Sequence, residues 1–203
     1  QDTADFDPGS GTANLTSAGG ENIFFAKYNN AGDYIWAKAI GGASSVRSYS
    51  NLSLDNMGNV YVSSCFQGIA DFDPGPGTVN LTSAGSLDIF FAKYSSSGDY
   101  LWAKRLGGTS ANIGYSIALD DTGNVYVTGA FRSTVDFDPG VGTSNLTSAG
   151  FYDIFFAKYS NSGDYLWAKS LGGTLNDAAL SIALDVMGNV YITGWFQSTV
   201  DFD

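Results

Sequence analysis

The sequence predicts an all-β protein built as a repeat array, and two observations carry that prediction. The run Asp-Phe-Asp-Pro-Gly that begins at Asp5 recurs at Asp71 and at Asp136, and Asp-Phe-Asp returns at Asp201. Each unit holds four short segments rich in β-branched and aromatic residues, bounded by Gly, Asn, Asp or Ser. Because no stretch shows sustained helical periodicity, we expect antiparallel strands and no helix longer than a turn or two.

The repeat also defines the units and their strands. Successive units span residues 5–70, 71–135 and 136–200, a fourth begins at residue 201, and residues 1–203 form one array. The four segments of the middle unit are residues 88–94, 100–106, 115–120 and 124–131. Tight loops that contain glycine join them as hairpins. Four hairpin-connected strands per unit are the pattern of a β-propeller blade.

The strand segments are apolar on both faces, as in the run Ile89-Phe90-Phe91-Ala92. A sheet with one solvated face would alternate apolar and polar residues. Blades that pack against neighbours on both faces account for the pattern. The fold we expect is therefore a β-propeller-type array of four-stranded antiparallel blades, with a stacked β-solenoid as the alternative.

Two stretches carry a family resemblance. DIFFAKYSSSGDYLWAKRLGG at residues 88–108 and LDDTGNVYVTGAF at residues 119–131 resemble the bacterial repeat called SBBP, which is named for seven-bladed β-propellers. The DFDPGxGTxNLTSAG connection is similar to a variant of secreted and cell-surface proteins. The resemblance covers all three units and implies a propeller in an extracellular or cell-surface setting, without implying an activity.

The resemblance also implies where each blade begins and ends. In that family the innermost strand corresponds to the SIALD segment, followed outward by GNVYVTG, DIFFAKY and YLWAK. Residues 22–40 would then be two outer strands and residues 180–196 two inner strands, so that together they make up one split blade. About three blades are fewer than the roughly four to eight of a propeller ring, and unpaired edges attract partners. We expect the split blade to be completed head to tail, by another copy or by adjacent repeats of a longer chain, giving a closed propeller or a filament.

Composition argues against several classes of function. The net charge is −11, from 20 acidic and 9 basic residues, so nucleic-acid binding is not expected. No run approaches the ~18 apolar residues of a membrane-spanning helix, and we expect no membrane insertion. Histidine is absent, which removes the commonest general base and the usual zinc ligand. We expect no enzymatic activity, and calcium is the one cofactor that the residues suggest.

The Asp-Phe-Asp-Pro-Gly loops are the candidate calcium sites, because calcium prefers carboxylate and carbonyl oxygens. Their acidic residues are Asp5, Asp7, Asp71, Asp73, Asp136 and Asp138. The alternative is that these side chains cap the turn or pair with a lysine of the repeat.

A tryptophan recurs in the outermost strand of each unit, at Trp36, Trp102 and Trp167. Together with a nearby Tyr it could stack on carbohydrate, and the alternative is packing between blades or beneath the long connection. The sequence favours a non-catalytic extracellular structural or assembly protein. The alternative is a ligand-binding propeller module, for carbohydrate or calcium, within a larger secreted protein.

Overall fold

The fold is that of a computed structural model, which describes residues 3–42 and 46–202 of the chain. Asp203, part of the fourth repeat, lies outside the described residues. All regular structure in the described residues is β-strand, as the sequence predicts. No helix in these residues is long and apolar enough to cross a membrane.

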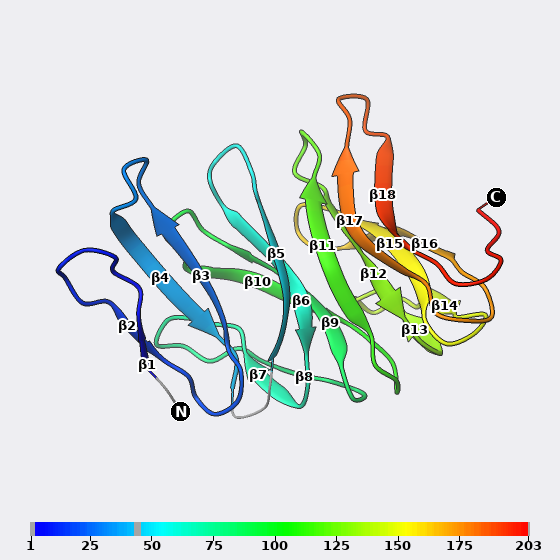
Figure 1. The fold of residues 1–203 in the computed structure, drawn as a ribbon, viewed down its shortest axis with the longest axis horizontal. Helices are drawn as coiled ribbons and strands as arrows, with labels where there is room; N and C mark the ends of the chain where they lie inside the picture. The colour runs from blue at the N-terminus through cyan, green and yellow to red at the C-terminus, as the bar shows by residue number, and fades with distance from the viewer. Residues whose placement is uncertain (1–2, 43–45, 203) are drawn as a thin grey trace.

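Two four-stranded antiparallel sheets form the centre of the molecule (Figure 1). The first blade, from inside to outside, consists of β5 (Val46–Leu54), β6 (Val60–Phe66), β9 (Asp88–Tyr94) and β10 (Tyr100–Leu106). The second blade consists of β11 (Ile113–Leu119), β12 (Val125–Phe131), β15 (Asp153–Tyr159) and β16 (Tyr165–Leu171). This strand order confirms the expected blade, in which the SIALD segment is innermost.

A two-stranded sheet flanks the two blades on each side. The head half-blade consists of β3 (Ile23–Tyr28) and β4 (Tyr34–Ile40), and the tail half-blade of β17 (Ala178–Leu184) and β18 (Val190–Trp195). The two half-blades lie on opposite sides of the two complete blades, so the described residues form an open arc (Figure 1).

Apolar contacts between successive blades make up the core. Side chains of a strand alternate between its two faces. In β9, Phe90 therefore packs in one cluster with Phe25 of the head half-blade, while Phe91 packs in another with Tyr159 of the second blade. The inner strands β5, β11 and β17 lie side by side, and the backbone N–H of Ile117 donates a hydrogen bond to Asn51 Oδ1. Because each complete blade packs against a neighbouring sheet on both faces, its strands carry apolar residues on both faces.

Each unit has more strands than the four predicted, because the long connection contains a short hairpin. The three hairpins are β1 (Thr3–Asp5) with β2 (Asn14–Thr16), β7 (Ile69–Asp71) with β8 (Asn80–Thr82), and β13 (Thr134–Asp136) with β14 (Asn145–Thr147). Three-residue strands are too short to show an alternating pattern, and the Pro and Gly between them indicate only a loop. The hairpin places a buried phenylalanine, Phe72 or Phe137, beneath each complete blade.

Candidate assembly interface

Each half-blade has a strand edge without a neighbour in the described residues. β3 pairs with β4 alone, and β18 pairs with β17 alone. In the first blade the equivalent strands, β6 and β9, pair along their whole length, with Val60 opposite Tyr94 and Phe66 opposite Asp88. β12 and β15 repeat this register in the second blade. The free edges of β18 and β3 are thus the repeat equivalents of the two edges that pair within a complete blade.

The head half-blade exposes aromatic side chains that the complete blades bury. Phe24 is 58% exposed, whereas its repeat equivalents Phe90 and Phe155 are fully buried. Tyr28 is also exposed, whereas its equivalent Tyr94 is buried. The strand that covers these positions in a complete blade has no counterpart beside β3 in the described residues.

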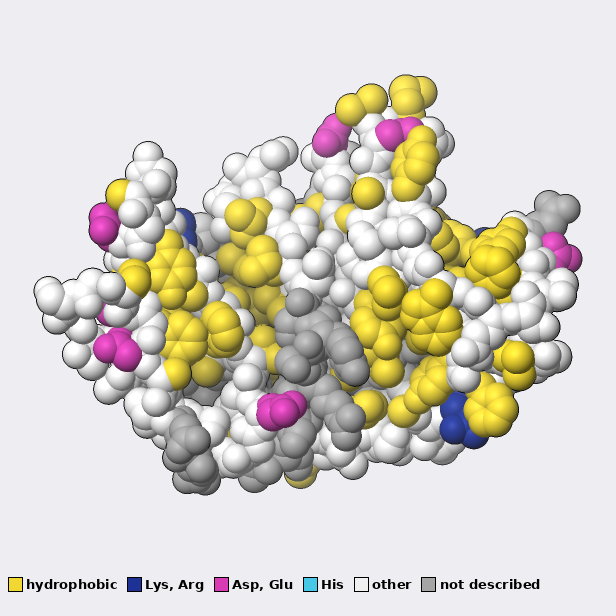
Figure 2. Space-filling model, in the orientation of Figure 1, with side chains coloured by type: hydrophobic (Ala, Val, Ile, Leu, Met, Phe, Trp, Pro, Cys, Tyr) yellow, Lys and Arg dark blue, Asp and Glu magenta, His cyan; other side chains and the backbone are white. Residues whose placement is uncertain are grey.

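The tail half-blade exposes the complementary set. Phe196 is 56% exposed, whereas its equivalent Phe131 is fully buried. Tyr191 is 57% exposed, whereas its equivalent Tyr126 is buried. Figure 2 shows exposed hydrophobic side chains at both ends of this face of the molecule as well as between them. The split-blade prediction did not name these four exposed aromatics, although aligning the units strand by strand would have identified them.

Three phenylalanine rings close the core of each complete blade. In the first blade they are Phe66, Phe72 and Phe90. The head half-blade has two of the three, Phe6 and Phe24, with ring centroids 4.8 Å apart. The tail half-blade also has two, Phe196 and Phe202, with ring centroids 5.7 Å apart. The tail lacks a ring equivalent to Phe90, which is the position of Phe24 on β3. The head lacks a ring equivalent to Phe66, which is the position of Phe196, directly after β18.

An apolar groove of about 580 Å³ follows the free edge of β3. Phe24, Ala26 and Tyr28 form one wall, and Leu52 and Val62 of the first blade form another. In the second blade the inner strands β11 and β12 lie between the equivalent surfaces. The groove therefore lies where an inner strand pair would complete the blade.

A lysine–aspartate pair ties the inner strands of each complete blade to its third strand. Lys93 Nζ lies 3.7 Å from Asp55 Oδ2, and Lys158 Nζ lies 3.2 Å from Asp120 Oδ2. Lys158 Nζ is also 4.8 Å from the ring centre of Tyr126. Partial burial alone would raise the pKa of Asp120, but hydrogen bonds from its own hairpin loop and from Lys158 outweigh burial and hold this pKa below its ordinary value. The Asp120 carboxylate is therefore fully charged at neutral pH.

The aspartates proposed for calcium bond to their own loops. Asp5 Oδ1 accepts hydrogen bonds from the backbone N–H groups of Asp7 and Ala13, and Asp7 Oδ1 accepts one from Gly9. The same bonds recur around Asp71, Asp73, Asp136 and Asp138. Across residues 3–42 and 46–202, no group of three or more Asp, Glu, Cys or His side chains is placed to hold a metal. Calcium binding here stays a prediction.

The recurring tryptophans lie half-buried on the outermost strands of their sheets. The ring of Trp102 meets those of Tyr61 and Phe91 edge-on, with centroids 6.0 and 5.6 Å apart. A Cβ atom on Gly98 of the first blade would lie 3.3 Å from the ring of Trp36. These rings therefore pack between blades, and carbohydrate stacking by Trp36, Trp102 and Trp167 stays a prediction.

Comparison with known proteins finds two partial matches among curated sequences. The chain is 32% identical, over 113 residues or 49% of its length, to the "Uncharacterized WD repeat-containing protein L264" of Acanthamoeba polyphaga mimivirus. It is 31% identical, over 114 residues or 56% of its length, to the "Regulatory protein FlaEY" of Caulobacter vibrioides. The matches cover 8% and 12% of those proteins, so this chain corresponds to a small part of each.

A family model gives a more specific result. Residues 101–130, which run from β10 through β12, match the model of the SBBP family, described as a beta-propeller repeat. The matched segment spans the passage from the outer strand of one blade to the inner strands of the next. Residues 101–130 are thus similar to an SBBP beta-propeller repeat, and the strand order of the two complete blades agrees with that match.

Proposed function

We propose that this protein is a non-catalytic structural module in which the tail half-blade of one copy completes the head half-blade of the next. An extracellular or cell-surface location belongs to the proposal and follows from the family resemblance. The observation that carries it is the match between the two open edges. The head edge exposes Phe24 and Tyr28, and the tail edge exposes Tyr191 and Phe196. In a complete blade the residues equivalent to these two sets are buried.

The repeat gives the arrangement of this joint residue by residue. By equivalence with the ladder of β6 and β9, Val190 lies opposite Tyr28 of the next copy, and Phe196 lies opposite Asn22. Phe24 of the next copy then supplies the third ring beside Phe196 and Phe202. Burying these surfaces stabilises the joint by about 25 cal/mol for each Å² of apolar area removed from water.

The geometry of the joint decides the size of the assembly. Each copy has two complete blades and two half-blades. Two copies joined at both edges would form a closed ring of six blades, within the usual range of propellers. A rotation per copy that does not close would produce a filament.

Sedimentation of the 203-residue chain over a micromolar concentration series tests the proposal. We expect a dimer or larger species that dissociates on dilution. Phe24→Asp and Phe196→Asp should each abolish association, because either change places a charge in the apolar joint. Leu101→Asp is the matched control, because Leu101 is similarly exposed but lies on the outer strand of a complete blade. A well-folded chain that stays monomeric at these concentrations would refute the proposal.

A further inference from the structure

Two families of lysine–aspartate pairs repeat along the array. The first lies within each complete blade and joins the loop between the inner strands to the third strand, as in the pair of Lys93 with Asp55. The second joins successive sheets. Lys38 Nζ of the head half-blade lies 3.7 Å from Asp99 of the first blade, and Lys104 Nζ lies 3.8 Å from Asp164 of the second.

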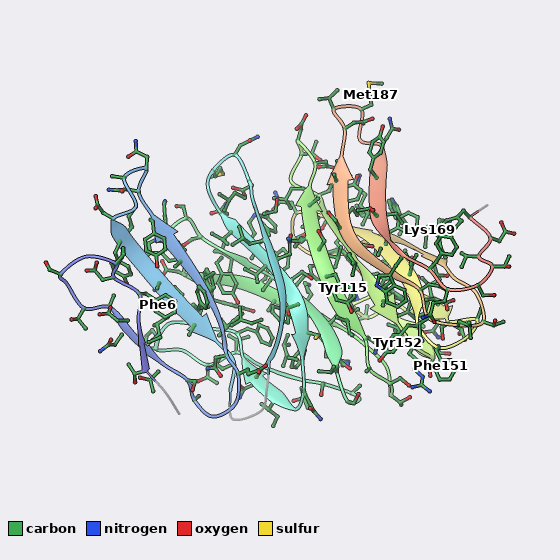
Figure 3. All side chains as sticks on the ribbon, viewed as in Figure 1. Phe6, Tyr115, Phe151, Tyr152, Lys169 and Met187 are labelled. Carbon is green, nitrogen blue, oxygen red and sulfur yellow. The ribbon has the colours of Figure 1, made fainter. Side chains whose placement is uncertain are left out.

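At each end of the molecule, one residue from each of these two sets of lysine–aspartate pairs has no ion-pair partner in the described residues. Lys27 is equivalent to Lys93, and Asp33 to Asp99; both belong to the head half-blade, where they are exposed. At the tail, Asp185 is equivalent to Asp120, and Lys169, on β16, is exposed. Lys169 lies at the opposite end of the molecule from Phe6, which marks the head (Figure 3).

We propose that these four charged groups pair across the joint, Lys27 with Asp185 and Asp33 with Lys169, and that they restrict the partner to a copy joined head to tail. This inference rests on the proposed function. The head presents a lysine and an aspartate, and the tail presents the opposite charge at each matching position. Joining two heads or two tails by pairing β3 with β3, or β18 with β18, leaves these charges without their repeat partners.

Of the two ion pairs, Lys27 with Asp185 contributes more to the stability of the joint. In the first blade both side chains of the equivalent pair are mostly buried, and Lys93 Nζ also lies 4.9 Å from the ring centre of Tyr61. Tyr191 occupies the equivalent position beside Asp185 and donates a hydrogen bond to its Oδ2. The aspartates of the second family are mostly exposed, and exposed ion pairs contribute little. Charge reversal at the first pair is therefore the sharper test.

Two single variants test the pairing by mixing. Lys27→Glu places two acids at each joint between its copies, and Asp185→Lys places two cations there. We expect either variant alone to associate roughly tenfold or more weakly than the natural chain, because like charges oppose each other in a partly buried site. An equimolar mixture should regain association, since the acidic head of the first variant meets the basic tail of the second. The other joint in the mixture has the natural pair.

Asp121→Lys is the control for net charge, because Asp121 is exposed on the hairpin loop of the second blade and has no place in the joint. Circular dichroism of each variant reports folding separately. The pairing is supported if each single variant associates weakly and only their equimolar mixture regains association. If the natural chain associates and both single variants associate equally well, the pairing is wrong while the proposed function stands. If the natural chain stays monomeric, the proposed function fails first and the pairing with it.

Discussion

Asp88, Asp153 and Asn22 occupy the same position in successive units, at or just before the start of the third strand, and each has a buried oxygen without a hydrogen-bond partner. Asp88 is also bound by Arg105, with Nη1 2.5 Å from Oδ2. The repeat equivalent of Arg105 is Ser170 in the second blade and an alanine in the head half-blade. The second blade thus buries a carboxylate without the cation that balances it in the first.

This difference affects stability through Asp153. Burial, reinforced by the negative charge of Asp177, raises the pKa of Asp153 above its ordinary value of 3.8. A raised pKa means that the folded protein holds this proton more tightly than the unfolded chain. The ionised group therefore costs nothing well below pH 3.8, and it lowers stability as the pH rises from there through the folded pKa.

We expect Asp153→Asn to stabilise the protein at pH 7, because a neutral amide replaces a buried carboxylate whose ionised form the folded state disfavours. Asn22 shows that an amide fits this position in another unit. The gain should disappear near pH 3, which urea unfolding at both pH values would measure. Asp88→Asn is the matched control and should destabilise, because it removes the charged partner of Arg105. Equal effects of the two changes would contradict this account.

Calcium provides a second test at the level of residues. If the loops bind calcium, we expect the melting temperature to rise with calcium concentration; a constant temperature up to millimolar calcium would leave the carboxylates as acceptors of backbone hydrogen bonds alone. A ligand that binds the folded state would raise this temperature progressively with its concentration. Such a rise, removed by Asp71→Asn and Asp73→Asn together, would instead establish the loops as calcium sites.

At the level of elements, the blade strands were predictable and the short hairpins were not. β9 and β10 have the predicted bounds, because turn residues flank an apolar run at each end. β11 begins at Ile113, two residues before the predicted start, because pairing with β12 extends the strand through Gly114. The hairpin of β7 and β8 depends on Phe72 packing under the blade, a contact distant from its own sequence pattern.

The aromatic triad gives a prediction at this scale. Phe90→Ala should lower the free energy of unfolding by about 3–5 kcal/mol, because it empties a buried site between two other rings. Phe24→Ala changes the equivalent residue at an exposed position and should cost less than about 1 kcal/mol in the dilute monomer. Urea unfolding at low protein concentration measures both. If the two changes lower the free energy of unfolding by similar amounts, Phe24 is already buried in the dilute protein.

At the level of the whole molecule, the arc contains the same segment twice. Residues 3–6 and residues 199–202 are repeat equivalents, and each has part of the contacts of a complete blade. The first pairs with β2, and Tyr28 donates a hydrogen bond to the carbonyl of Phe6. The second lies against Gly173, whose added Cβ would come 2.5 Å from the carbonyl oxygen of Thr199. A completed joint has room for only one of them.

We expect residues 199–202 to keep this place and residues 3–6 to leave it. The tail segment is already seated on its own second blade as residues 134–137 are seated on the first, with Val200 against Gly173. All three residues of β1 are exposed, and they are held mainly by pairing with β2.

Removing residues 1–6 should therefore tighten association roughly fivefold, which corresponds to about 1 kcal/mol, because this segment no longer competes for the site. Removing residues 199–203 should weaken association. Sedimentation over a dilution series compares the two truncated chains with the full one, and circular dichroism confirms that each is folded. If removing residues 1–6 weakens association instead, the head segment keeps its place, and the tail segment is the one displaced when two copies join.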